Sequence, residues 1–150
     1  MIIEGSFTVK APIQKLWDLL LEPETLGSCL PGAEKIEKID DVTYDAVVKQ
    51  KVGPIKVKLV FKNKLTKVEA PNHLELEGEG EDVTKLGHMK QKTTMDLKDI
   101  GGGNVEVSYK SDVSIVGKLA MFGDRIMKSK AKDVEKEFTK NLQEKLKGIA

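Results

Sequence analysis

The side chains most able to do chemistry are few: one cysteine and two histidines among 150 residues. A zinc site takes three or four ligands, and no second cysteine or histidine stands near Cys29, so we predict no metal site. A cysteine nucleophile needs a neighbouring base, and nothing in the sequence places His73 or His88 beside Cys29. We therefore interpret Cys29 as a buried structural thiol and both histidines as solvated residues near turns.

Two further patterns imitate ligand sites. The glycines at 101–103 lack a following Lys-Ser/Thr pair and stand between strand patterns, so they indicate a hairpin loop rather than a phosphate loop. Glu77, Glu79 and Glu81 are spaced by two, which is typical of a solvated strand face and not of a calcium loop. The sequence predicts no catalytic residue and no cofactor.

Polar residues on the inward faces of predicted strands are the strongest binding signal. Asn63 shares the face of Leu59 and Phe61, and Ser111 shares the face of Val113. Buried polar groups need partners, which a wet cavity would supply; alternatively, they hydrogen-bond one another across adjacent strands or lie near strand ends. The candidate cavity residues on the strands are Tyr44, Asn63, Gln91, Thr93 and Ser111.

The elements that position these residues follow from hydrophobic periodicity. Residues 3–9 alternate as a half-buried strand, Pro12 opens a helix through Leu20, and Pro23 starts a second short helix through Leu26. From there to about residue 116 the period is two. The strand at 55–64 carries lysines outward and the strand at 74–81 carries glutamates outward, which predicts an antiparallel hairpin with opposite charges across its outer surface.

After Gly117 the period becomes helical for about 25 residues. Its apolar face is formed by Met127, Ala131, Val134, Phe138 and Leu142. The order predicts a single α+β domain over residues 1–150: a curved antiparallel sheet of six or seven strands, two short helices after the first strand, and a long C-terminal helix packed across the concave face. A helix across a curved sheet leaves room for a ligand pocket.

Composition narrows the class of partner. The net charge is +1 and Arg125 is the only arginine, which argues against nucleic acid. The single cysteine fits a reducing compartment, no apolar run reaches the roughly 20 residues that span a bilayer, and the first residues lack a signal-peptide pattern. We expect a cytoplasmic protein without an integral membrane segment, and the Lys/Glu-rich composition favours a heat-adapted source.

Several segments resemble one known family. They are Phe7-Thr8-Val9-Lys10-Ala11-Pro12, Glu22-Pro23-Glu24-Thr25-Leu26, Cys29-Leu30-Pro31-Gly32-Ala33, Val52-Gly53-Pro54, Gly117-Lys118-Leu119-Ala120-Met121-Phe122-Gly123 and Phe138-Thr139-Lys140-Asn141-Leu142. Together they resemble the carbon monoxide dehydrogenase CoxG family of the START-like, or SRPBCC, helix-grip superfamily. The resemblance spans essentially the whole chain.

This resemblance implies a non-enzymatic accessory protein with an apolar cavity, linked to CO dehydrogenase-type molybdenum hydroxylases in their maturation, membrane attachment or quinone supply. We expect a quinone-like or lipid-like ligand, and a protein that is peripheral to the membrane through its partner. The mouth is predicted where the two most specific segments meet, with Met127 as a further contact. Its residues are Leu30, Pro31, Gly32, Leu119, Phe122 and Gly123.

Two alternatives stay open. The chain could be an interaction or maturation module with a filled core, in which case the mouth segments are hinges of the chain. It could also be a cavity enzyme such as an aromatic cyclase, which requires an acid or base inside. We expect the acids of every strand to face outward, which favours binding over catalysis.

Overall fold

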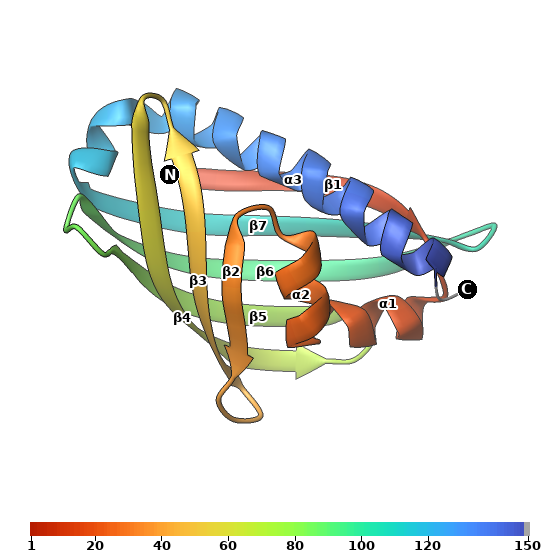
Figure 1. Cartoon of the computed structure of the whole chain (residues 1–150). Helices are drawn as coiled ribbons and strands as arrows, with labels where there is room; N and C mark the ends of the chain where they lie inside the picture. Colours follow the sequence, from red (N-terminus) through yellow and green to blue (C-terminus); the bar gives the residue numbers. More distant parts are fainter. Residues whose placement is uncertain (149–150) are drawn as a thin grey trace.

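Seven antiparallel strands form one curved sheet in the order β1-β7-β6-β5-β4-β3-β2 (Figure 1). The computed structural model describes residues 1–148. The strands are β1 Ile2–Lys10, β2 Ala33–Lys38, β3 Thr43–Val52, β4 Ile55–Glu69, β5 His73–Asp82, β6 Gly87–Gly101 and β7 Asn104–Gly117. This architecture confirms the predicted fold class. The strand that periodicity alone left undefined is β2, whose residues are mostly exposed.

The helices cover the concave side of the sheet. They are α1 Ile13–Leu20, α2 Pro23–Cys29, the 3-10 helix η1 Lys118–Phe122 and α3 Gly123–Gly148. Extended Pro12 precedes α1, and Pro23 occupies the first turn of α2, where a missing N–H costs nothing. The second helix ends at Cys29 rather than at Leu26. In Figure 1, α3 runs diagonally across the sheet, with α1 and α2 beneath its C-terminal part.

Two separate apolar clusters form the interior. The first cluster lies under α1, α2 and the end of α3; its buried members are Val9, Ala11, Leu16, Trp17, Leu19, Leu20, Cys29, Leu74, Leu97, Val105, Val107, Leu142 and Leu146. The second cluster lies beside η1 and the start of α3; its buried members are Val52, Val57, Leu59 and Leu119. The core is therefore divided along the length of the sheet.

The packing of α3 follows that division. Leu142 is fully buried and Leu146 is 4% exposed, both in the first cluster. Of the other predicted face residues, Phe138 packs against the first cluster and Met127 against the second, and both are half-buried. Leu146 was missing from the predicted face.

The outer surface carries the predicted charge pattern. In the register of β4 and β5, Lys62 lies opposite Glu79 and Lys64 opposite Glu77. The same glutamates form ion pairs with lysines of β6, Lys90 to Glu79 at 3.4 Å and Lys92 to Glu77 at 3.7 Å. All these side chains are well exposed, so the pairs contribute little individually to stability.

Candidate functional site

A line of polar side chains crosses the concave face between the two clusters, beginning with Asn63 and Gln91. The amide of Gln91 on β6 donates to Oδ1 of Asn63 on β4 at 3.2 Å. The intervening β5 residue is Gly78, where an added Cβ would overlap that oxygen. The glycine therefore lets the hydrogen bond pass directly over the backbone of β5.

The line continues with Thr93 on β6 and Ser111 on β7. These residues are direct partners in the register, and their hydroxyl oxygens are 2.7 Å apart. Ser111 is 9% exposed, while Thr93 is half-buried. Asn63, Gln91, Thr93 and Ser111 therefore follow the second alternative in one respect: they hydrogen-bond one another in pairs.

The third pair joins the sheet to the helix. The hydroxyl of Tyr109 donates to Oε1 of Glu135 on α3 at 2.6 Å. Both groups lie above Gly5 of β1, where an added Cβ would overlap the carboxylate and stand 2.7 Å from the phenol oxygen. Burial, and then the bond to Glu135, raise the pKa of Tyr109, so the phenol keeps its proton and acts as a donor.

Sequence reasoning missed Glu135 because it searched the strands for inward acids. The signal was present in α3: Glu135 follows Ala131 by four residues and precedes Phe138 by three, so it lies on the same helix face. The expectation that strand acids all face outward is also wrong for Asp82, which is 1% exposed.

Asp82 has a structural task at the end of β5. Its Oδ1 accepts the backbone N–H of Lys58 at 2.9 Å, and its Oδ2 accepts those of Thr84 at 3.0 Å and Leu86 at 3.2 Å. The Thr84 hydroxyl also donates to Oδ2. These bonds, the Thr84 hydroxyl first, lower the pKa of Asp82. The carboxylate organises the β5–β6 turn beside the second cluster.

Tyr44 does not join the polar line. Its hydroxyl donates to the backbone carbonyl of Leu21 at 2.6 Å, and the residue is 8% exposed. That bond fixes the short connection between α1 and α2 to β3. Asn141 donates to the carbonyl of Cys29 at 3.0 Å and thereby joins α3 to the end of α2. Cys29 itself is 1% exposed, which confirms the buried thiol.

The two predicted mouth segments lie along the same strand. Gly32 adopts φ 83° against β3, its carbonyl accepting the N–H of Lys49 at 2.8 Å, and Gln50 donates to the carbonyl of Pro31 at 2.7 Å. The ring of Phe122 lies over Gly53, just beyond the end of β3. Leu30, Pro31 and Phe122 are half-buried.

Leu119 has a different environment from its neighbours in the segment. It is 1% exposed within the second cluster and lies against Gly87, whose added Cβ would be 2.8 Å from its methyl carbon. Met121, two residues on, is 84% exposed. Glycines with positive φ, Gly117 at 87° and Gly123 at 77°, bracket this short helix. The segment thus anchors one apolar side chain inside and presents another to solvent.

A groove of about 430 Å³ opens between the end of β7 and the first turns of α3. It is lined by Met1, Asp112, Val113, Ser114, Ile115, Ala120, Gly123, Asp124 and Met127. Gly123 and Met127 belong to the predicted ligand contacts. Val113 lies opposite Gln91 in the register and two residues beyond Ser111, so the wall of the groove continues into the polar line.

Side chains that face each other across the interior are incompletely covered. Met127, Ala131 and Val134 of α3 are half-buried, and so are Phe61, Met89 and Gln91 on the strands opposite. The main approaches of α3 are to β1, β3, α2 and η1. The helix is therefore held at the rim of the sheet, and the apolar surface beneath its first half is not tightly filled.

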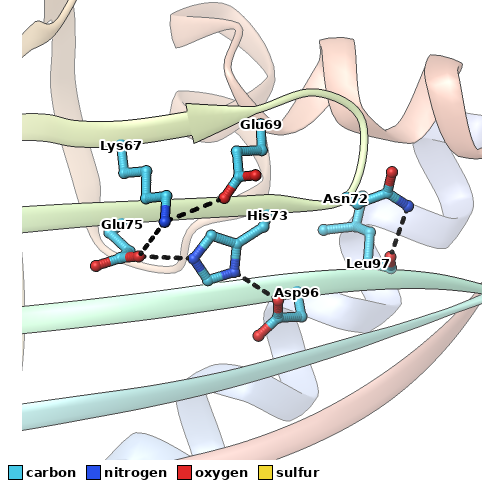
Figure 2. Close-up of polar contacts among 7 residues, drawn as sticks. All are labelled: Lys67, Glu69, Asn72, His73, Glu75, Asp96 and Leu97. Carbon is cyan, nitrogen blue, oxygen red and sulfur yellow. Dashed lines mark hydrogen bonds and ion pairs between the residues drawn. The ribbon is translucent and has the colours of Figure 1, made fainter.

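His73 lies on the opposite, convex surface (Figure 2). Its Nδ1 is 2.6 Å from Asp96 and its Nε2 is 2.8 Å from Glu75. These bonds, that of Glu75 first, raise the pKa of His73. With its side chain 24% exposed, His73 is less solvated than predicted. Among residues 1–148, no group of three or more His, Cys, Asp or Glu is arranged to hold a metal ion.

The chain matches the family model for CoxG, a component of carbon monoxide dehydrogenase, over residues 5–147. No protein of curated function matches it at a significant level. No helix within residues 1–148 combines the length and apolar character needed to cross a membrane.

Solved structures share the fold. A conserved protein from Geobacillus kaustophilus is 24% identical with a TM-score of 0.90, and the alignment covers 99% of this chain and 96% of that one. A START superfamily protein from Mycobacterium smegmatis gives 11%, 0.75, and 99% coverage of both chains. The ZhuI aromatase/cyclase from Streptomyces sp. R1128 gives 11%, 0.68, and coverage of 97% and 92%. At these identities, the likeness establishes the START-like fold alone.

Proposed function

We propose, from the premise that the chain belongs to the carbon monoxide dehydrogenase CoxG family, that it is a non-enzymatic accessory protein which binds an apolar molecule between α3 and the sheet. The ligand is quinone-like or lipid-like, and the partner is a molybdenum hydroxylase of the CO dehydrogenase type. The protein works in the cytoplasm, where its buried thiol stays reduced, and reaches the membrane through that partner.

The observation that carries this proposal is the divided core. Half-buried apolar side chains from α3 and from the strands face one another between the two clusters, where a filled domain would bury them completely. An apolar ligand would cover these side chains and gain the free energy of burying them. The groove beside Met127, at about 430 Å³, is within the size range of small-molecule sites.

The test is direct binding. Native mass spectrometry of the protein purified from its own source should show a co-purified quinone or lipid. Calorimetric titration of the delipidated protein with a short-tailed menaquinone analogue should give saturable binding with a negative heat-capacity change, the signature of apolar burial. Absence of any bound or titratable apolar molecule would refute the carrier role.

A second candidate is an interaction module with no ligand, and one observation favours it. Asn63 with Gln91, and Thr93 with Ser111, satisfy each other's hydrogen-bonding groups, so the polar line does not need a ligand to be stable. The two functions separate in the titration above. A module without a ligand would bind its enzyme partner equally well before and after delipidation.

An enzyme of the same fold is a third candidate, because Glu135 places a carboxylate on the concave side, hydrogen-bonded to Tyr109. Such a pair could exchange a proton with a bound substrate. The distinguishing measurement is turnover: a bound quinone or polyketide-like compound recovered unchanged after incubation supports the carrier, and a changed product supports the enzyme.

A further inference from the structure

We propose that the Tyr109–Glu135 pair is the head-group anchor of the interior site and selects ligands whose polar end is a neutral hydroxyl, such as a phenol or a hydroquinone, against ligands that end in a carboxylate. This inference rests on the proposed binding function, because it concerns the chemistry of the same interior. It follows from three features of the pair: its free acceptor atom, its surroundings and its position.

The free acceptor is Oε2 of Glu135. Oε1 accepts the Tyr109 hydroxyl at 2.6 Å, and within residues 1–148 no donor is bonded to Oε2. Glu135 is half-buried and Oε2 is not sealed from solvent, so this oxygen remains accessible. A carboxylate oxygen accepts hydrogen bonds and cannot donate one. The complementary ligand group is therefore an O–H.

The surroundings disfavour a negative head group. The inward positions of β3 to β7, over the part of the chain that the structure describes, carry apolar or neutral polar residues and one carboxylate, Asp82, with no lysine or arginine among them. A second carboxylate brought beside Glu135 would find like charge in a region of reduced dielectric. Fatty acids and other anionic lipids would be rejected on that ground.

The position suits a head group with an apolar tail. Tyr109 is two residues from Ser111 on the same face of β7, so the Thr93–Ser111 hydroxyls lie next along the line. Hydroxyls can rotate to donate or accept, which lets them follow the ligand's second oxygen. Beyond the line lie Met89 and Met127, whose thioether side chains adapt to irregular apolar shapes. The tail would therefore extend toward the second cluster.

Gly5 shows that the chain reserves space for this pair. Any Cβ at residue 5 would overlap both the Glu135 carboxylate and the Tyr109 hydroxyl. Packing of α3 on β1 alone does not require a charged group at this point, because Ala131 and Phe138 flank Glu135 on the same helix face.

The test uses three ligands with one tail: 4-decylphenol, 1-decanol and decanoate, titrated by calorimetry at pH 8 into the whole chain. The wild type should bind the phenol and the alcohol at least about tenfold more tightly than decanoate, the ratio that corresponds to one hydrogen bond to a charged group. Glu135→Gln should weaken the phenol and strengthen decanoate, so that the ratio collapses. Glu137→Gln, an exposed change two residues away, is the matched control and should leave the ratio intact.

The head-group comparison in the wild type needs no variant, so it stands even if Glu135→Gln unfolds, and Tyr109→Phe offers a milder second change. Equal binding of all three ligands to the wild type, or a ratio that Glu135→Gln leaves intact, overturns the anchor and leaves the binding function in place. Failure of all three ligands to bind overturns the proposed function itself.

Discussion

The two ends of the interior are built differently. At the first cluster, three helices and five strands converge on side chains such as Val9, Leu16 and Leu142 that have no exposed surface. At the second cluster, the buried set is small, and half-buried residues such as Phe61 and Met127 surround it. One end has the packing of an ordinary core, and the other has the incomplete packing of a binding site. Stability and binding are thereby assigned to different parts of one sheet.

Truncations on the same helix should give the largest contrast. Leu142→Ala removes a fully buried side chain of the first cluster and should lower the free energy of unfolding by about 2–5 kcal/mol. Met127→Ala, on a half-buried residue, should cost about 1 kcal/mol or less. Urea denaturation followed by the fluorescence of Trp17 measures both. Equal losses would show that the ends do not differ.

The second prediction concerns the polar support of the open end. Asp82→Asn places an amide group among N–H donors and should cost about 2 kcal/mol. Because the pKa of Asp82 is lowered in the folded state, its contribution is present above the unfolded value of about 3.8 and is lost as pH falls through the folded value. Denaturation curves between pH 7 and pH 3 should therefore converge for wild type and variant. A constant gap would place the effect elsewhere.

Phe122→Asp separates a mouth residue from a core residue. The ring lies over Gly53 and is half-buried, so the charged side chain can turn to solvent. We expect a loss of stability of about 1 kcal/mol together with at least tenfold weaker binding of a menaquinone analogue. Thermal melts with parallel calorimetry test this. Complete unfolding would assign Phe122 to the core, beside Leu119.

The smallest effect should come from the convex surface. The pKa of His73 is raised by Glu75 and then by Asp96, so its contribution to stability is full below about pH 6.5 and disappears as pH rises through the folded value. His73→Gln should lower Tm slightly at pH 5.5 and leave it unchanged at pH 9, with ligand binding unaffected at both. NMR titration of the imidazole gives the pKa directly, and a value at or below 6.5 would contradict the bonded geometry.

Most of the fold could be predicted from the sequence, because alternation in strands and three-four spacing in α3 are local properties. The faces of Asn63, Gln91, Thr93 and Ser111 followed from the same alternation. Their pairing could not, since it depends on the register across β4 to β7. Tyr44 illustrates the same limit: its face was clear from neighbouring residues, but its bond to Leu21 depends on where the helices enter the concave side.

The Tyr109–Glu135 pair marks a second limit. A glutamate in a lysine-rich helix usually indicates a solvated charge, and only its spacing from Ala131 and Phe138 distinguishes it. Gly5, in a strand of alternating apolar residues, gave a weak sign of close approach, but the partner could be identified only in three dimensions.

The bare inner surface of β5 also affects how this interior can change over evolutionary time. Gly78 and Gly80 lie on the same face of the pleat, and an added methyl group would meet Asn63 at the first position and the Phe61 ring at the second. Small-to-larger replacements there reshape the chamber without altering any helix or turn. A lineage could thus fit the same scaffold to shorter or bulkier cargo by single-codon steps, and a protein engineer could retune its selectivity at the same two sites.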